Sequence, residues 1–303
     1  MCYVAGFGVA NCDLFFTGVP RVPREGEEMY ADGFAMRPGG GAPATMTILG
    51  RLGVRTHLET FLGDDPFSRL VEEELRRGGV EYHNLYRGTG YPTVISATMV
   101  TPKDRTFMSY RDRLTLTDAM EDGIAERFAG ASIVQMQLGD LRLYEKIKRR
   151  NPRVKFVLDT GWMDDLSIET CRAHLELADY YTPNRTEALK VTGADTPEEA
   201  LKVLGRYFAE PIVKLDRDGC LTMAGGTMVR VPPMAGVSQV DSTGAGDAFL
   251  AGLMYGLYHE RPIAQSIAYG NVTGGACVTQ LGCLTAFVDE PTLLREAARL
   301  RPE

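Results

Sequence analysis

Apolar residues recur at two spacings along the chain, and the change between them separates strands from helices. Four short apolar runs predict strands in the second half of the chain, at 133–137, 154–158, 180–183 and 212–215. Helical stretches separate most of these strands, and such an alternation favours a parallel sheet with right-handed crossovers. We therefore predict an α/β fold, with a central, mostly parallel sheet that is flanked by helices.

The first half of the chain carries the same two patterns in a less regular order. Strand patterns are found at 3–9, 29–36, 58–63, 93–101 and 105–110, and the last two pair across a turn. One helical pattern follows the glycines at 39–41, and another follows Asp65, whose residue type is typical of a helix cap. Further helical patterns are found at 249–257, 263–280 and 293–300. A small hairpin is expected at 221–231.

Composition narrows the classes of partner. The 303 residues carry a net charge of −7 without any basic run, so we expect neither nucleic acid nor a membrane as a partner. No apolar run is long enough to span a bilayer, and we expect no signal peptide, since the N-terminus lacks a basic region and a cleavage site. The six cysteines lack the spacing of a zinc site, which indicates free thiols in a reducing, cytoplasmic location.

The most informative stretch is Val-Asp-Ser-Thr-Gly-Ala-Gly-Asp-Ala-Phe at 240–249, where a loop leads into a helix. Residues 241–243 are of the types that cap helix starts, and Gly244 and Gly246 leave the backbone open to close approach. The N–H groups of a first helical turn have no partner within the helix, and they lie at the positive end of its dipole. The stretch therefore predicts an anion site.

Asp247 adds a carboxylate to the first turn of the same helix. Because like charges repel, a carboxylate is out of place in a site that only binds an anion. It fits a site where a phosphoryl group leaves its donor while the carboxylate orients and deprotonates an acceptor hydroxyl. We expect the helix N-terminus to favour the ionised form of Asp247.

The string Asp-Ser-Thr-Gly-Ala-Gly-Asp-Ala-Phe closely resembles the second signature of the PfkB/ribokinase family of carbohydrate kinases. The resemblance covers essentially the whole chain. It implies one ribokinase-like domain over 1–303, with a small β-sheet lid formed from parts of 14–36 and 91–113. It also implies an ATP-dependent kinase that phosphorylates a primary hydroxyl of a sugar, with Mg²⁺ on the ATP phosphates. The implied anion hole is Gly244, Ala245 and Gly246, and Asp247 is the implied catalytic base.

A second glycine-rich stretch, Pro-Gly-Gly-Gly-Ala-Pro-Ala at 38–44, resembles the first signature of the family in its fructokinase-like form. The glycines pack against the sugar in that family, which implies sugar contacts at Gly39, Gly40 and Gly41. Fructokinase-like members usually carry Asn at the next position, whereas this chain has Thr45, which offers one hydroxyl in place of an amide.

Asn11 and Asp13 complete the expected sugar site. They follow the first strand, at the edge of the sheet where open α/β folds bind ligands. Turn residues alone would give the same pattern. In the family that this chain resembles, an Asp at the corresponding place hydrogen-bonds sugar hydroxyls, which favours a role for Asp13 in binding.

The expected nucleotide side begins at Asn-Arg-Thr-Glu, 184–187, which matches an Asn-x-x-Glu motif of the family and also has the pattern of a helix capping box. The resemblance implies that Glu187 acts on magnesium and phosphate through water, since a cation held by waters and ATP oxygens needs few protein ligands. It also suggests a monovalent cation, K⁺, near Asp241 and Ser242. The residues assigned to the nucleotide or its phosphates are Asn184, Glu187, Lys214, Thr243, Gly246 and Asn271.

Three arginines, Arg105, Arg111 and Arg113, lie in or near the expected lid, and we assign Arg105 to the substrate site. Solvated surface charge and contact with an acidic substrate both explain such residues. The acceptor is therefore open, with a nucleoside or an acidic sugar of the ketodeoxygluconate type as alternatives to a neutral sugar. A catalytically silent sensor on a kinase fold is a further alternative. Lid strands pair between subunits in some family members, so a homodimer through the lid is also a hypothesis.

Overall fold

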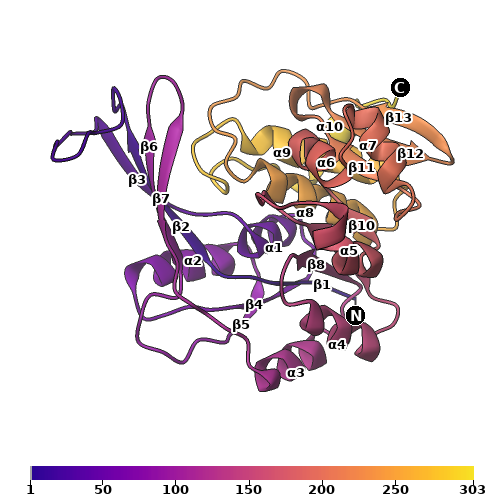
Figure 1. The fold of residues 1–303 in the computed structure, drawn as a ribbon, viewed down its shortest axis with the longest axis horizontal. Coiled ribbons are helices and arrows are strands. Elements are labelled where there is room, and N and C mark those ends of the chain that lie inside the picture. The colour runs from indigo at the N-terminus through magenta and orange to yellow at the C-terminus, as the bar shows by residue number, and fades with distance from the viewer. Residues whose placement is uncertain (1) are drawn as a thin grey trace.

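The computed structural model describes residues 2–303 and is built around a six-stranded sheet (Figure 1). All neighbouring strands in this sheet are parallel, in the order β10-β9-β8-β1-β4-β5. The strands are β1 (Val4–Phe7), β4 (Thr56–Thr60), β5 (Glu81–Asn84), β8 (Ile133–Gln137), β9 (Lys155–Asp159) and β10 (Tyr180–Tyr181). The prediction of a parallel central sheet is confirmed.

Helices cover both faces of the central sheet because successive strand residues point to opposite sides. Val4 belongs to one hydrophobic cluster, while Ala5 and Phe7 belong to the other. The cluster around Val4 includes buried residues of α1 (Ala42–Arg51), α2 (Pro66–Arg77), α8 (Ala245–Tyr258), α9 (Ile263–Cys277) and α10 (Glu290–Ala297). The opposite cluster includes residues of α3 (Asp118–Arg127), α4 (Leu141–Arg150), α5 (Ile168–Leu177), α6 (Arg185–Thr192) and α7 (Pro197–Leu204).

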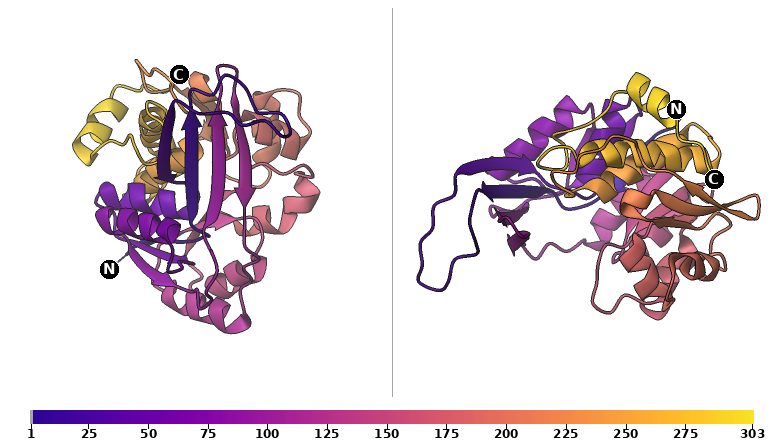
Figure 2. Two further views of the ribbon diagram at one scale, coloured as in Figure 1. Left: turned by 90° about the vertical axis from the view of Figure 1, so that its left-hand side faces the viewer. Right: turned by 90° about the horizontal axis from the view of Figure 1, so that it is seen from above.

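A four-stranded sheet stands beside this body at the position expected for a lid (Figure 2). Its order is β3-β2-β6-β7, formed by β2 (Asn11–Thr17), β3 (Gly33–Pro38), β6 (Val94–Val100) and β7 (Arg105–Tyr110). Strands β2 and β6 are parallel, and the other neighbours are antiparallel. Since β2 follows β1 after three residues, the chain passes almost directly from the central sheet into the lid.

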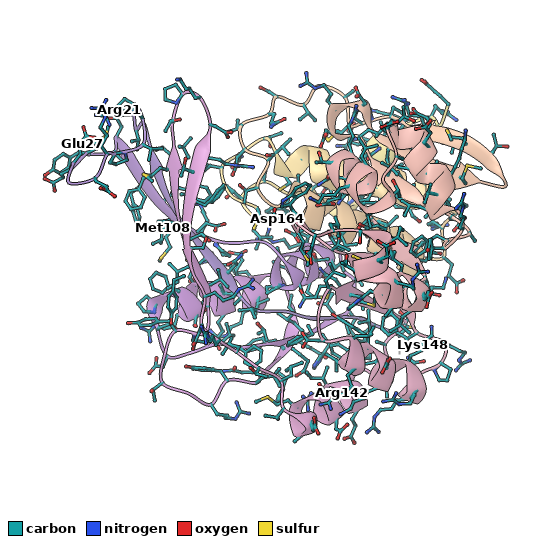
Figure 3. All side chains as sticks on the ribbon, in the orientation of Figure 1. Arg21, Glu27, Met108, Arg142, Lys148 and Asp164 are labelled. Carbon is teal, nitrogen blue, oxygen red and sulfur yellow. The ribbon has the colours of Figure 1, made fainter. Side chains whose placement is uncertain are left out.

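The two largest differences in strand boundaries from the sequence prediction lie in β3 and β4. The strand predicted at 29–36 begins at Gly33, because residues before it form a loop whose tip is held by an ion pair between Arg21 and Glu27 (Figure 3). The strand predicted at 58–63 runs instead over Thr56–Thr60, because its pairing with β1 starts at Thr56 opposite Val4. Asp65 caps α2 as predicted, accepting hydrogen bonds from the N–H groups of Phe67 and Ser68 at 2.9 Å each.

The strand predicted at 212–215 does not extend the parallel sheet as expected. It forms β11 (Ile212–Lys214), which pairs antiparallel with β12 (Cys220–Ala224) after a short 3₁₀ helix (Asp216–Asp218). The predicted hairpin is confirmed, with β13 (Thr227–Val231) as its second strand. A single bridge between Asn184 and Lys214 links this small sheet to the chain that follows β10. Within residues 2–303, no helix has the length and apolar character needed to cross a bilayer.

Candidate active site

Helix α8 begins at the glycine-rich stretch, and its N-cap has a backbone conformation that favours glycine. Its N-cap is Gly244, with φ of 76°, rather than one of the residues at 241–243. A side chain at position 244 would be strained by this φ, and its Cβ would also overlap Cys283 Cβ. Glycine is therefore needed where the chain turns into the helix, and the amides of Ala245 and Gly246 follow directly in the first turn.

Asp241 folds the loop that leads into this turn, which corrects the expectation that it caps the helix. Its Oδ1 accepts hydrogen bonds from the Thr243 N–H at 3.0 Å and the Thr243 hydroxyl at 2.8 Å. Its Oδ2 accepts a hydrogen bond from the Gly282 N–H at 2.9 Å. The buried carboxylate thus connects residues 241–243 to the loop at 281–283 by hydrogen bonds, and these bonds stabilise the loop that leads into α8.

Asp247 lies on α8 at the meeting point of the two glycine-rich stretches. A Cβ atom at Gly40 would overlap Asp247 Oδ2, so the backbone of residue 40 packs directly on the carboxylate. Burial raises the pKa of Asp247 to about 6, and the nearby charge of Asp159 adds to this effect. The Gly41 backbone N–H and the charge of Lys214 act in the opposite direction. We expected the helix N-terminus to favour the ionised form, but burial has the larger effect and makes Asp247 more basic than an ordinary aspartate.

Asn11 and Asp13 come together with Gly39 on the other side of Gly40. The Gly39 N–H donates to the Asn11 carbonyl at 2.7 Å, and a Cβ atom at Gly39 would lie 2.6 Å from Asn11 Cβ and 3.1 Å from Asp13 Oδ2. Burial raises the pKa of Asp13 to about 6, assisted by the charge of Asp241 and opposed by Arg105. Asn11 Oδ1 is buried without a hydrogen-bond partner among residues 2–303, as expected for an atom that a ligand would satisfy.

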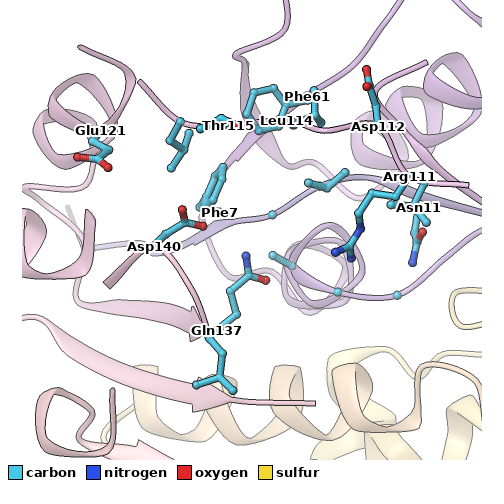
Figure 4. A pocket seen from close by; sticks show the side chains of 18 residues that line it. Phe7, Asn11, Phe61, Arg111, Asp112, Leu114, Thr115, Glu121, Gln137 and Asp140 are labelled. Carbon is cyan, nitrogen blue, oxygen red and sulfur yellow. The ribbon is translucent and has the colours of Figure 1, made fainter. Parts of the chain in front are cut away.

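A cavity of about 590 Å³ opens from these residues (Figure 4). Asn11, Gly40, Gly41 and Arg111 are among the residues that line it, and Figure 4 shows Asn11 and Arg111 in the same part of the view. The remaining wall combines the apolar side chains of Phe7, Val9, Phe61, Val94, Leu114, Leu116 and Leu138 with the polar side chains of Asp112, Thr115, Glu121, Gln137 and Asp140. A concave space of this size, lined by both apolar and polar side chains, is typical of a small-molecule site.

Lys214 lies beside Gly246, which is in the first turn of α8. Its Nζ is 3.6 Å from the position that a Cβ atom on Gly246 would take, and 4.0 Å from Asp159 Oδ2. Sequence reasoning assigned no role to Asp159, although the residue ends strand β9 at the sheet edge where ligands bind. The position of Lys214 suits neutralisation of phosphate charge next to the turn.

Asn184 and Glu187 form the capping box of α6. The Asn184 N–H donates to Glu187 Oε2 at 2.9 Å, and the Glu187 N–H donates to Asn184 Oδ1 at 2.9 Å. Burial raises the pKa of Glu187, while the charge of Lys214 opposes this shift. Both groups therefore stabilise the helix start, and they lie in the electrostatic neighbourhood of Lys214.

Thr45 and Asn271 have structural contacts in place of the ligand contacts that we expected. Thr45 is fully buried on α1, and its hydroxyl donates to the carbonyls of Gly41 at 3.4 Å and Asp247 at 3.5 Å. Helical threonines commonly form such a bond to the carbonyl four residues earlier, which turns the hydroxyl away from the cavity. The Asn271 amide donates to the carbonyls of Val231 at 3.1 Å and Pro232 at 2.8 Å.

The three arginines have three different environments. Arg105 does not line the cavity. Its side chain contacts the loop at 241–243, where it forms an ion pair with Asp241. Arg111 is exposed, as surface charge would be, and it also lines the cavity. Arg113 is exposed. The assignment of Arg105 to the sugar itself is thus corrected, because its side chain contacts Asp241, Ser242 and Thr243 and does not line the cavity.

Metal binding by protein groups alone is not supported within residues 2–303, which contain no group of three or more His, Cys, Asp or Glu side chains placed to hold an ion. The carboxylates of Asp159 and Glu187 nevertheless flank Lys214 near the turn. Carboxylate oxygens suit a magnesium ion that takes its other ligands from nucleotide phosphates and water.

Comparison with known proteins agrees with this arrangement. The chain matches the profile of the pfkB family carbohydrate kinases over residues 3–290. It is 28% identical to Fructokinase-1 of Zea mays over 293 residues, which cover 88% of this chain and 90% of that protein. The structure of Arabidopsis thaliana ribokinase complexed with ribose and ATP superimposes with a TM-score of 0.83 at 22% identity, over 98% of this chain and 99% of that one. The structure of adenosine kinase from Sinorhizobium meliloti superimposes with a TM-score of 0.77 at 21% identity, over 98% of this chain and 99% of that one.

The structural matches establish a ribokinase-like fold, and the match to the family spans nearly the whole chain. The chain therefore belongs to the pfkB family of carbohydrate kinases, which are phosphotransferases with an alcohol group of a sugar as acceptor.

Proposed function

We propose that the protein transfers the γ-phosphoryl group of ATP to a primary hydroxyl of a sugar bound between Asn11 and Gly40. The observation that carries this proposal is the packing of Gly40 on Asp247, because Gly40 also lines the cavity together with Asn11 and Gly41. A hydroxyl bound next to Gly40 would lie between the carboxylate and the anion turn. Such a position is what in-line phosphoryl transfer requires.

Asp247 acts as the base in this proposal. Its pKa of about 6 leaves the carboxylate ionised at neutral pH, yet more basic than an ordinary aspartate. It accepts a hydrogen bond from the acceptor hydroxyl, orients its oxygen toward the phosphorus atom, and takes the proton as the new bond forms. The Gly41 backbone N–H favours the ionised form of this carboxylate, since it lowers the Asp247 pKa.

The amides of Gly244, Ala245 and Gly246 stabilise the charge on the moving phosphoryl group, because they lie at the start of α8 and carry its positive end. Lys214 adds a positive charge beside Gly246. Mg²⁺ bound to the ATP phosphates supplies further charge neutralisation, and Asp159 and Glu187 are the residues that would hold its water ligands. Asn184 orients Glu187 through the capping box.

A monovalent cation at Asp241 stays a prediction. The resemblance suggests K⁺ near this carboxylate, whereas Arg105 already forms an ion pair with it. Assays in potassium and in tetramethylammonium chloride decide the matter, since the bulky organic cation cannot replace a small bound ion. Equal rates in the two salts would remove K⁺ from the mechanism.

An acidic sugar is the second candidate acceptor, and the position of Arg111 favours it. This arginine lines the cavity beside Asn11, where its guanidinium could bind a carboxylate through two parallel hydrogen bonds. The hydroxyl oxygens of a neutral sugar would accept hydrogen bonds from the same guanidinium. If the acceptor is acidic, Arg111→Ala should raise its KM far more than the KM of a neutral analogue.

We also propose that two copies associate through the outer face of the lid. Met36, Leu14, Ala97 and Met108 lie opposite one another across the four strands. Phe34, Met108 and Tyr110 are 64%, 73% and 49% exposed. Figure 3 shows Met108 on the side of the lid that faces away from the helical body. An apolar sheet face of this kind is more often an interface than a surface left in water.

The decisive experiment measures ADP release with Mg-ATP across ketoses, aldoses, sugar acids and nucleosides, for the parent and for Asp247→Asn. Asp164→Asn, which changes an exposed aspartate outside the site, serves as the control. We expect one class of acceptor to drive ADP release, and Asp247→Asn to lower kcat by roughly 1,000-fold while ATP binding persists. Ligand binding without ADP release from any acceptor would favour the sensor alternative.

A further inference from the structure

Arg105 connects the lid to the loop that precedes the anion hole. Its Nη1 donates to the Asp241 carboxylate and to Thr243 Oγ1, the latter at 2.8 Å. Its Nη2 donates to Ser242 Oγ at 2.8 Å. One guanidinium thus holds all three residues before Gly244, although it comes from a strand that lies 136 positions away from Asp241 in the sequence.

The position of Arg105 in the lid makes this contact depend on where the lid lies. Arg105 is the first residue of β7, opposite Val100 at the end of the hairpin, and it shares a face of the sheet with Phe107, whose ring lies 5.6 Å from the guanidinium carbon. The same face carries the buried residues Asp13 and Phe15. Arg105 therefore projects from the inner face of the lid, and it reaches the loop only while the lid covers the site.

Charge gives this contact a second consequence. The Asp241 side chain is 5% exposed and the Arg105 side chain 29%, so their attraction is screened less than that of a surface pair. Asp13 lies within the field of both groups, since Asp241 raises its pKa and Arg105 lowers it. Asp13 is carried by lid strand β2 and would move together with Arg105. Lifting the lid would therefore remove the guanidinium from one buried carboxylate, that of Asp241 in the loop of the anion hole.

We propose that Arg105 is a positioning residue that couples lid closure to phosphoryl transfer. By binding Asp241, Ser242 and Thr243, it fixes the loop in the shape that directs the Gly244–Gly246 amides at the phosphoryl group. Because the arginine is carried by the lid, this shape is complete only when the acceptor is covered. The inference rests on the proposed function and adds to it a residue that touches neither the acceptor nor the cavity.

The test is a double-mutant cycle measured with the identified acceptor. The variants are Arg105→Ala, Asp241→Asn and their combination, with Arg113→Ala as the control for loss of an exposed arginine near the lid. We expect Arg105→Ala to lower kcat by roughly 10- to 100-fold while the KM of the acceptor changes little. The double variant should be no slower than the slower single variant, because the two residues act as one unit.

Two further measurements separate positioning from a general effect on folding. Guanidinium chloride at sub-denaturing concentration should restore part of the rate of Arg105→Ala, and none of the loss in Asp241→Asn. Arg105→Lys should retain an intermediate kcat, since one ammonium group cannot bind the three side chains as the planar guanidinium does. If Arg105→Ala unfolds, the Lys variant and its cycle with Asp241→Asn carry the test.

Two results would overturn the inference. A raised acceptor KM with unchanged kcat in Arg105→Ala would make the arginine a substrate ligand, and additive losses in the double variant would show that the two residues act independently. Failure of the proposed function looks different. In that case the parent releases no ADP with any acceptor, or Asp247→Asn keeps the parent rate.

Discussion

Gly40 packs so closely on Asp247 that a Cβ atom at position 40 would overlap the carboxylate oxygen Oδ2. The two residues belong to different glycine-rich stretches, one before α1 and the other at the start of α8. Glycine at position 40 thus lets the backbone before α1 approach the carboxylate, and this approach sets where the carboxylate lies relative to the cavity.

Gly40→Ala should therefore displace the Asp247 carboxylate. We expect kcat to fall by roughly 100-fold, since a misplacement of about 1 Å has an effect of that size on a positioned catalytic group. Steady-state kinetics with the identified acceptor checks this, with Gly123→Ala on α3 as the control, because a Cβ there meets only the flexible end of Arg127. A Gly40→Ala enzyme with the parent kcat would mean that Asp247 does not need its present position.

The rate should depend on pH through Asp247. The base is the ionised carboxylate, so kcat/KM should be constant above the pKa and fall as the pH decreases through about 6. Asp13 titrates in the same range, because its pKa is also raised to about 6. The measurement is a profile of log kcat/KM between pH 5 and pH 8, a range that includes both pKa values of about 6. Asp13→Asn is measured beside the parent, so that the titration of Asp247 is seen without that of Asp13. A kcat/KM that stays constant down to pH 5, below the raised pKa of about 6, would contradict the role of Asp247 as the base.

Asp247→Asn should stabilise the fold while it removes activity. The pKa rises from 3.8 to about 6 on folding, so the folded protein holds the proton more tightly than the unfolded chain. Ionised Asp247 therefore lowers the free energy of unfolding, by at most about 3 kcal/mol, and this cost is present above the folded pKa and disappears as the pH falls to the unfolded value. We expect a higher Tm for Asp247→Asn than for the parent at pH 8, above that folded pKa. The difference should shrink at lower pH, and an unchanged Tm in both conditions would argue that the carboxylate is well solvated.

The proposed dimer predicts that a charge on the outer face of the lid separates the two copies. Met108→Asp would place a carboxylate in the apolar row that also includes Leu14 and Ala97, and burying that charge in an interface would be strongly unfavourable. Sedimentation velocity should show a dimer for the parent and a monomer for Met108→Asp. Met163→Asp, at an exposed methionine outside the lid, should leave the dimer intact. A parent that stays monomeric at all concentrations would contradict the proposal.

Much of the fold was predictable from local patterns. The strand at 133–137, the paired strands that include Arg105–Tyr110, and the cap at Asp65 all appear where the sequence indicates. Such features depend on backbone preferences and on hydrogen bonds between residues close in the chain, and both are visible in a short stretch of sequence. The Gly-Ala-Gly-Asp string pointed to an anion turn for the same reason, because the conformation of a helix start is local.

Other features depended on contacts between distant segments. The ion pair between Arg105 and Asp241 could not be predicted from the sequence, because it forms only where the lid folds over the start of α8. Likewise, the acidic group at position 247 is plain from the sequence, whereas its raised pKa follows from burial and from the charge of Asp159. Side-chain burial and the distance between charges are set by packing across the whole molecule. The sequence by itself thus determined the family and the alternation of strands and helices, and it predicted Asp247 as the base, whereas only the tertiary structure decided which partner each charged group has.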